Sequence, residues 1–161
     1  MRVTLAFILL TAVVGAQSAP ALQFRGGGSA HATIAPAPAT VDGTAGAKVS
    51  LAVDVTPKPG IHVYAPGASE FYMPIDLKID PKPDFKAGKL IYPKSEMMTF
   101  GDEKVPVFQK AFKLTDDVTL AKGARSGSTI AVTGNVHLQA CDDKVCFPPE
   151  TVPVSWSINV R

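Results

Sequence analysis

The chain has 161 residues, of which 46% are hydrophobic, 19% charged and 7% aromatic. This length fits one domain with a buried core, and a formal net charge of +2 gives no electrostatic reason to expect a nucleic-acid partner. The 14 prolines and 13 glycines disfavour a helical bundle, because proline interrupts helices. Two cysteines are too few for a disulfide-scaffolded miniprotein or a four-cysteine zinc site. The composition favours one globular domain rich in β structure.

Residues 1–19 have the three-part layout of a secretory signal peptide. Arg2 precedes an apolar stretch over residues 3–14, and small residues follow up to Ala19. The alternative is a membrane anchor, but the stretch falls short of the ~20 apolar residues that span a bilayer. We therefore expect export, with cleavage after Ala16 or Ala19. Residues 20–30 contain a Gly-Gly-Gly-Ser run that predicts a flexible leader, which leaves residues 31–161 as the folded domain.

Alternating apolar and polar residues predict β-strands over much of the remaining chain. The clearest alternation lies over residues 49–55, 75–79, 130–138 and 152–160, with shorter candidates at 61–64, 89–92 and 105–114. No stretch of ten residues or more has the 3.6-residue period of a helix. About seven to nine short strands separated by turn residues predict an all-β fold, with an immunoglobulin-like antiparallel β-sandwich as the default topology.

The two cysteines flank a short polar turn. A long strand is predicted to run into Cys141, and Cys146 begins the return after residues 142–145. Closing so short a loop stabilises a protein by only about 2 kcal/mol in the chain-entropy model, and a bond across an exposed turn is of the labile kind. On the residues alone, a structural staple and a redox-active pair are equally well supported. Phe147, which follows the second cysteine, is expected in the core or in the wall of a site.

Other chemistries that use cysteine are less well supported. Zinc or copper would need further soft ligands, and neither the histidines nor Met97 and Met98 form a ligand repeat beside the cysteines. A cysteine hydrolase needs a Cys–His pair, but the strand rise places His137 roughly 13 Å from Cys141. We therefore expect neither a metal nor a cofactor.

The segment Gln139–Thr151, which reads QACDDKVCFPPET, resembles the active-site segment of the N-terminal periplasmic domain of DsbD, the thiol:disulfide interchange reductase. Residues 59–64 (PGIHVY) are similar to the glycine-led aromatic strand of that family, and residues 92–101 fall where the family has its cap loop. The resemblance extends from Ala32 to the C-terminus. It implies an immunoglobulin-like sandwich that carries a redox-active cysteine pair.

The resemblance also implies a role for each matched residue. Cys141 and Cys146 would be the exchanging thiols, in an order that stays open. His62 and Tyr64 would line the site beside them, and Phe100 would be the cap aromatic that shields the disulfide. In the family, the cysteine pair takes electrons from a membrane-embedded partner and hands them to periplasmic thioredoxin-like proteins. We therefore expect a periplasmic location and partners of these two kinds.

The sequence departs from the family pattern in three ways. The cysteine spacing is one residue shorter than in the best-known member. The segment before the cap aromatic lacks paired acidic residues, so Glu96, Asp142 and Asp143 become the candidate carboxylates that tune the thiols. The chain is also expected to have neither a transmembrane domain nor a C-terminal thioredoxin-like domain, so it would not move electrons across a membrane by itself.

A second function from another class stays open beside the exchange function. It is a non-catalytic, immunoglobulin-like interaction module whose disulfide is only structural. The reduction potential separates the two, because structural disulfides lie below about −300 mV.

Overall fold

The computed structural model describes residues 28–161, so the predicted signal peptide and most of the predicted leader lie outside the described residues. This part of the chain is all-β, as predicted, and has no helix that is long and apolar enough to cross a membrane. Its strands are β1 (Ala32–Pro36), β2 (Thr40–Gly43), β3 (Lys48–Pro57), β4 (His62–Tyr64), β5 (Asp76–Ile79), β6 (Phe85–Ala87), β7 (Glu96–Phe100), β8 (Glu103–Phe108), β9 (Phe112–Leu120), β10 (Thr129–Leu138), β11 (Ala140–Cys141) and β12 (Glu150–Val160).

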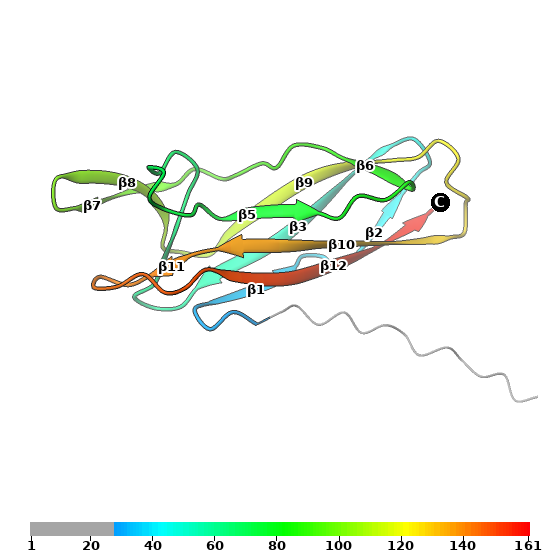
Figure 1. Ribbon diagram of the computed structural model, residues 1–161. Coiled ribbons are helices and arrows are strands. Elements are labelled where there is room, and N and C mark those ends of the chain that lie inside the picture. Colours follow the sequence, from blue (N-terminus) through cyan, green and yellow to red (C-terminus); the bar gives the residue numbers. More distant parts are fainter. Residues whose placement is uncertain (1–27) are drawn as a thin grey trace, which may run out of the picture.

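Two four-stranded sheets form the larger part of the molecule, which we call the sandwich body (Figure 1). Their strand orders are β1-β3-β9-β6 and β2-β12-β10-β5, and all pairings are antiparallel except the parallel pair β12–β2. Alternate residues of the long strands are buried, because a strand sends successive side chains to opposite faces. Trp156 of β12 is fully buried, and its indole N–H donates to the carbonyl of Ala52 at 3.0 Å. This core holds the two sheets together.

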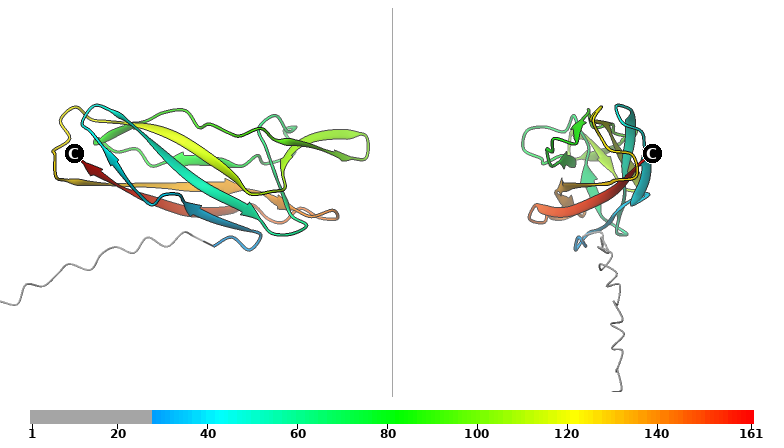
Figure 2. Two further views of the ribbon diagram at one scale, coloured as in Figure 1. Left: turned by 180° about the vertical axis from the view of Figure 1, so that it is seen from behind. Right: turned by 90° about the vertical axis from the view of Figure 1, so that its right-hand side faces the viewer.

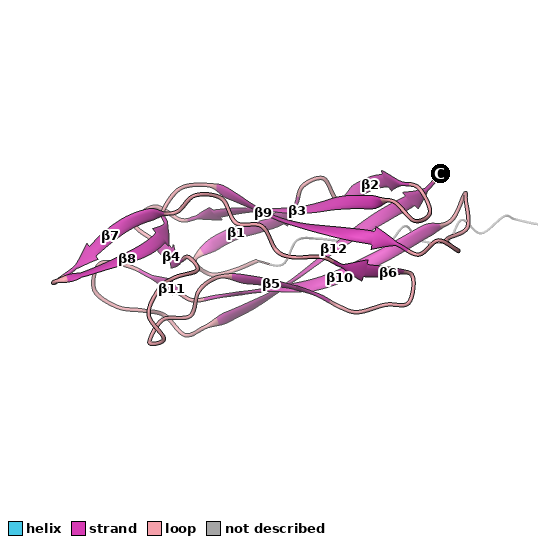
Figure 3. Cartoon of the chain, turned by 90° about the horizontal axis from the view of Figure 1, so that it is seen from above, coloured by secondary structure: helices cyan, strands magenta, loops and turns pink. Residues whose placement is uncertain are grey.

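A third sheet, with the order β11-β4-β8-β7, extends the molecule at the end opposite the C-terminus (Figures 1 and 3). We call β4, β7, β8, β11 and the turn over residues 142–145 the disulfide end. The β7–β8 hairpin and that turn project at the same end of the molecule, as the left view of Figure 2 also shows. Gly101 forms the hairpin tip with a φ of 57°, a conformation that glycine adopts without steric cost.

The sequence predicted the long strands better than the short ones. Three of the segments with the clearest alternation lie within β3, β10 and β12, while residues 75–79 and 61–64 each begin one residue before β5 and β4. The prediction over residues 89–92 is wrong, because only an isolated bridge between Ile91 and Thr115 forms there. Residues 105–114 are divided between β8 and β9. More strands exist than the seven to nine expected, since the short strands β1, β2, β6, β7 and β11 were not predicted. Each has five residues or fewer, and such a length leaves little room for a period of two.

The predicted long strand into Cys141 is in fact two strands in two sheets. β10 ends at Leu138 beside β12, and β11 begins at Ala140 beside β4. The change of sheet carries the first cysteine out of the sandwich body and places it against the short aromatic strand β4.

Candidate functional site

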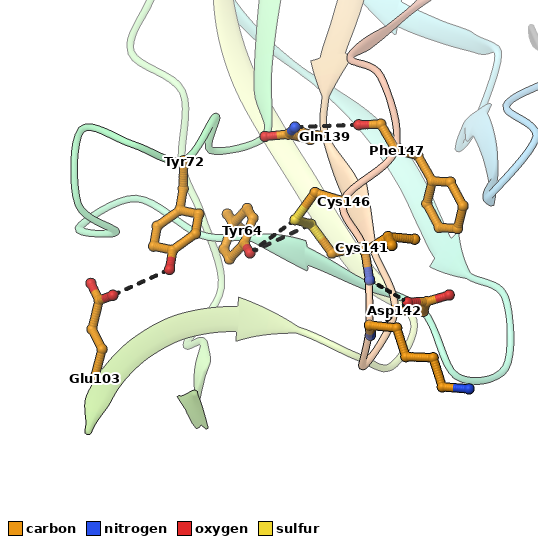
Figure 4. Close-up of a disulfide and its surroundings, with 10 residues drawn as sticks. Tyr64, Tyr72, Glu103, Gln139, Cys141, Asp142, Cys146 and Phe147 are labelled. Carbon is orange, nitrogen blue, oxygen red and sulfur yellow. Dashed lines mark hydrogen bonds between the residues drawn. A yellow bond between two sulfur atoms is a disulfide. The ribbon is translucent and has the colours of Figure 1, made fainter. Parts of the chain in front are cut away.

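A disulfide joins Cys141 to Cys146, whose Cα atoms lie 4.0 Å apart across the turn (Figure 4). The two residues also form an isolated antiparallel bridge. The Asp142 carboxylate stabilises the turn, because its Oδ1 atom accepts hydrogen bonds from the backbone N–H groups of Lys144 and Val145, each at 2.8 Å. These two bonds, first to Val145 and then to Lys144, lower the pKa of Asp142. An aspartate with this local bonding is typical of a tight turn.

The two sulfur atoms of the bond lie in different surroundings. Cys141 is only 1% exposed and packs in a small cluster with Tyr64, Val105 and Val107. Cys146, by contrast, is exposed on the return from the turn. Solvent and large molecules therefore approach the bond from the side of Cys146.

Tyr64 places a hydroxyl group at both sulfur atoms. Its oxygen lies 3.4 Å from Sγ of Cys146 and 3.4 Å from Sγ of Cys141 (Figure 4). The ring of Tyr64 stacks on that of Tyr72 at a centroid distance of 4.3 Å, and the Tyr72 hydroxyl donates to the Glu103 carboxylate at 3.2 Å. Burial raises the pKa of Tyr64, so this hydroxyl keeps its proton at neutral pH and can donate it to sulfur.

Phe100 closes the aromatic group from the β7–β8 hairpin. Its ring centroid lies 5.1 Å from that of His62, and it lines a cavity of about 200 Å³ together with Tyr64, Tyr72 and both cysteines. The tertiary structure thus brings together four of the residues that the sequence singled out: Cys141, Cys146, Tyr64 and Phe100 line one cavity. His62 contacts Phe100 and belongs to a neighbouring cavity of about 270 Å³.

Phe147 is not among the residues that line the disulfide cavity. Its ring packs on that of His31 at a centroid distance of 3.8 Å, and its backbone N–H donates to the carbonyl of Ala140 at 2.8 Å. His31 in turn lies 3.4 Å from the carboxylate of Glu150, which also accepts a hydrogen bond from the Ala30 N–H at 3.1 Å. Phe147 therefore packs the segment after Cys146 against His31, close to the first residues that the structure describes.

The three candidate carboxylates have different surroundings. Glu96 pairs with Lys110 at 2.8 Å and is absent from the lining of both cavities, whereas Asp142 lies in the turn between the cysteines. Asp143 lines both cavities. Glu103, for which the sequence predicts no role, is connected to the site through the hydrogen bond that it accepts from Tyr72. The roles of Tyr72 and Glu103 could not be predicted from the sequence. Tyr72 lies in a loop without periodicity, and Glu103 contacts it only in the folded chain.

The described residues contain no group of three or more His, Cys, Asp and Glu side chains that could hold a metal ion. The chemistry available at this site is that of the disulfide, with a hydroxyl donor and an aromatic cover beside it.

Fold and site define a class of protein: an immunoglobulin-like β-sandwich with a disulfide at one end. The sequence profile of the family described as "Thiol:disulfide interchange protein DsbD, N-terminal" matches residues 31–156, which is most of the chain. The chain belongs to this family, as the resemblance of residues 139–151 predicted. A search of curated proteins found no match.

The structural matches include two N-terminal domains. The N-terminal domain of Neisseria meningitidis DsbD in its reduced form has 20% sequence identity and a TM-score of 0.44, with 71% of this chain and 82% of that chain covered. The N-terminal periplasmic domain of ScsB from Proteus mirabilis has 13% identity and a TM-score of 0.54, with 78% of this chain covered. The match spans 46% of the ScsB chain, and this likeness concerns the fold alone.

Proposed function

We propose that the protein is a periplasmic thiol–disulfide exchange module in which Cys141 and Cys146 pass electrons between a membrane-embedded reductase and thioredoxin-fold proteins. Membership of the DsbD N-terminal family supports exchange as the activity. The observation that carries the proposal is the asymmetry of the disulfide, with Cys146 exposed and Cys141 buried beside a hydroxyl donor. Our proposal adds the two kinds of partner and the transfer of electrons between them.

The geometry supports a defined course for the exchange. A thiolate of the partner attacks Sγ of Cys146, a new sulfur–sulfur bond forms, and the Cys141–Cys146 bond breaks. The electron pair stays on Cys141, where the Tyr64 hydroxyl can donate to the forming thiolate from 3.4 Å. A second thiol of the partner then displaces Cys146, so the partner leaves as a disulfide and both cysteines of this chain are reduced. Electron flow in the other direction follows the same steps in reverse.

Phe100 has the position of a lid in this proposal. It lines the same cavity as both cysteines and comes from a hairpin that projects from the sandwich body. Because exchange requires direct access to sulfur, an aromatic ring in this place slows attack by thiols that do not displace it. A partner would have to move the ring before its own sulfur reaches Cys146.

The experiment that tests the proposal is capture of the mixed disulfide. Cys141→Ser leaves the exposed Cys146 without a resolving thiol, so this variant should accumulate covalent adducts with thioredoxin-fold proteins in a periplasmic extract. The adducts should disappear when reductant is added. Cys146→Ser is the matched control, since its remaining thiol is buried and should form far fewer adducts, and the double variant should form none. If neither single variant captures a thioredoxin-fold protein, the carrier function is refuted.

The second candidate is an interaction module with a structural disulfide. The packing of Cys141 against Tyr64, Val105 and Val107 favours it, because the bond then also fixes the turn to the third sheet. A reduction potential well below about −300 mV would support this structural function, and a higher potential would support exchange.

The proposed location rests on the leader, which lies outside the described residues. Mass spectrometry of the mature protein from a periplasmic fraction should find an N-terminus near Gln17 or Pro20. An intact Met1 in the membrane fraction would contradict export with cleavage.

A further inference from the structure

His62 is a buried histidine with an unpaired polar atom. The side chain is 2% exposed, and its Nε2 atom has no hydrogen-bond partner among residues 28–161. Leaving a buried polar atom unpaired lowers the stability of the folded state, so packing alone would favour an apolar residue at this position. A role other than packing would account for a histidine at this position.

The strand register places His62 beside the buried cysteine. β4 and β11 are antiparallel, and His62 is the direct cross-strand partner of Cys141. Such partners have their side chains on the same face of the sheet, with Cβ atoms roughly 4.5–5.5 Å apart. The imidazole also contacts the ring of Phe100, at a centroid distance of 5.1 Å, and that of Tyr64, at 5.6 Å. His62 and Cys141 thus lie on the same face of this sheet, in one layer with the rings of Tyr64 and Phe100.

Breaking the disulfide creates a charge in this layer. Burial disfavours a thiolate on Cys141, which is 1% exposed. The Tyr64 hydroxyl can donate one hydrogen bond to this sulfur but carries no positive charge, so the thiolate would still lack a counter-charge. Asp142 and Asp143 add negative charge from the turn, and solvent screens the exposed Lys144 beside them. A positive charge within the layer would offset the cost.

We propose that His62 takes up a proton when the Cys141 thiolate forms, so that an imidazolium and a thiolate face each other across β4 and β11. The inference rests on the proposed function, because it concerns the same exchange step. The incoming thiolate bonds to Sγ of Cys146, the Cys141–Cys146 bond breaks with its electron pair on Cys141, and His62 binds a proton from water. The proton returns to water when Cys141 attacks Cys146 again and the incoming thiol leaves.

The surroundings of His62 suit this change of protonation. Burial lowers the pKa of His62, while the nearby Asp143 and Asp142 oppose that shift. The ring is therefore neutral near pH 7 while the disulfide is intact. The other titratable groups that face it are Tyr64 on its own strand and Cys141 on the neighbouring one. Met98 and Gln109, which line the same cavity, carry no charge.

The first test uses the wild-type protein and needs no substitution. The ring proton signals of His62 are titrated by NMR in the disulfide form and after reduction with a phosphine. We expect the pKa of His62 to rise by about one unit or more on reduction, because an opposite charge within ~4–6 Å favours the charged form. An equal or lower pKa in the reduced form would overturn the inference.

The second test reads the thiolate itself. In Cys146→Ser only the Cys141 thiol remains, and its ionisation is followed by ultraviolet absorbance. Adding His62→Gln should raise the midpoint of this titration by about one pH unit or more. His137→Gln is the matched control, since His137 bonds to Thr151 at 3.0 Å in the sandwich body and should leave the midpoint unchanged. Burial raises the pKa of both Tyr64 and Tyr72, which moves the ionisation of their phenol groups to higher pH.

The outcomes separate the proton link from the proposed function. Both tests use a small reductant or a single thiol, whereas the carrier function depends on capture of a thioredoxin-fold protein. Captured adducts together with an unchanged Cys141 midpoint in His62→Gln would refute the proton link alone. A shifted midpoint without adducts would refute the carrier function alone.

Discussion

The sandwich body and the disulfide end bury different kinds of side chain. In the body, alternate positions of β3, β10 and β12 are filled by aliphatic residues around Trp156, and its indole N–H has a partner. At the disulfide end, Val63, Phe108 and Ala140 still belong to the main core. Tyr64, Val105, Val107 and Cys141 form a separate small cluster, and the ring of the buried His62 lies 5.1 Å from that of Phe100. The buried Nε2 atom of His62 lacks a hydrogen-bond partner among the described residues, and Cys146 of the disulfide is exposed.

This difference suggests a division of labour between the two regions. A body of long paired strands and apolar packing can supply the folding free energy by itself. The disulfide end can then keep groups that suit chemistry better than stability, since functional sites commonly depart from the rules of packing. Substitutions in the body should therefore change stability, and substitutions at the end should change the reactivity of the disulfide.

The largest expected effect on stability is that of Trp156→Ala. Removing a fully buried indole leaves a cavity between the sheets and an unpaired carbonyl at Ala52, so the free energy of unfolding should fall by about 3–5 kcal/mol. Denaturant unfolding measures this loss. The rate at which a small thiol reduces the molecules that remain folded should match that of the wild type. A strongly altered rate would show that the two regions are coupled.

Removing the disulfide should have a smaller effect. Cys141→Ser combined with Cys146→Ser should lower the free energy of unfolding by about 2 kcal/mol, since the loop that the bond closes is short. Asp142 and its two backbone hydrogen bonds still hold the turn. Circular dichroism and urea unfolding check the result. A double variant that does not fold would favour the structural disulfide of the interaction module.

Asp116→Asn should change stability less than loss of the disulfide, and in the opposite direction at neutral pH. Asp116 is 5% exposed in the sandwich body, and burial raises its pKa although the Gly88 N–H donates to it at 3.0 Å. A raised pKa means that folding favours the protonated form. The stability that this proton contributes is complete below the unfolded pKa of about 4 and is lost as the pH rises through the folded pKa.

Asparagine keeps an acceptor for Gly88 without the charge, so Asp116→Asn should be more stable than the wild type at pH 7 and should flatten the loss of stability above pH 4. Urea unfolding across this pH range measures both effects. Asp102→Asn, at an exposed position of the β7–β8 hairpin, is the matched control for the change in net charge. Equal behaviour of the two variants would show that burial of Asp116 has no energetic weight.

Phe100→Ala should have the smallest effect on stability and a clear effect on rate. The ring is only partly buried, and its loss opens the cavity in which the sulfur atoms lie. Reduction by dithiothreitol should therefore be several-fold faster, since access to sulfur limits exchange. Stopped-flow fluorescence measures the rate. Phe112→Ala, at a partly buried ring that stacks on Phe108, is the matched control and should not accelerate reduction. A wild-type rate in Phe100→Ala would remove this residue from the site.

The sequence predicted the longest strands of the body, β3, β10 and β12, and missed its short strands β1, β2 and β6. A period of two is legible over the ten residues of β10 and the eleven of β12, where one face is buried. The two residues of β11 and the five of β7 give no such signal, so the segment that holds Phe100 was expected as a loop, although it pairs with β8. Short strands are decided by the neighbours with which they pair, and these are distant in the sequence.

The sequence by itself determined the all-β class, the family and the identity of the two cysteines, because alternation and the QACDDKVCFPPET segment are local features. Only the tertiary structure decided which sulfur is exposed and which groups surround the other. Tyr64 and Tyr72 come from β4 and the loop after it, and Phe100 comes from β7, whereas Cys141 follows β10 after a change of sheet. Contacts of this kind depend on register between strands far apart in the chain, and register is fixed only when the core packs.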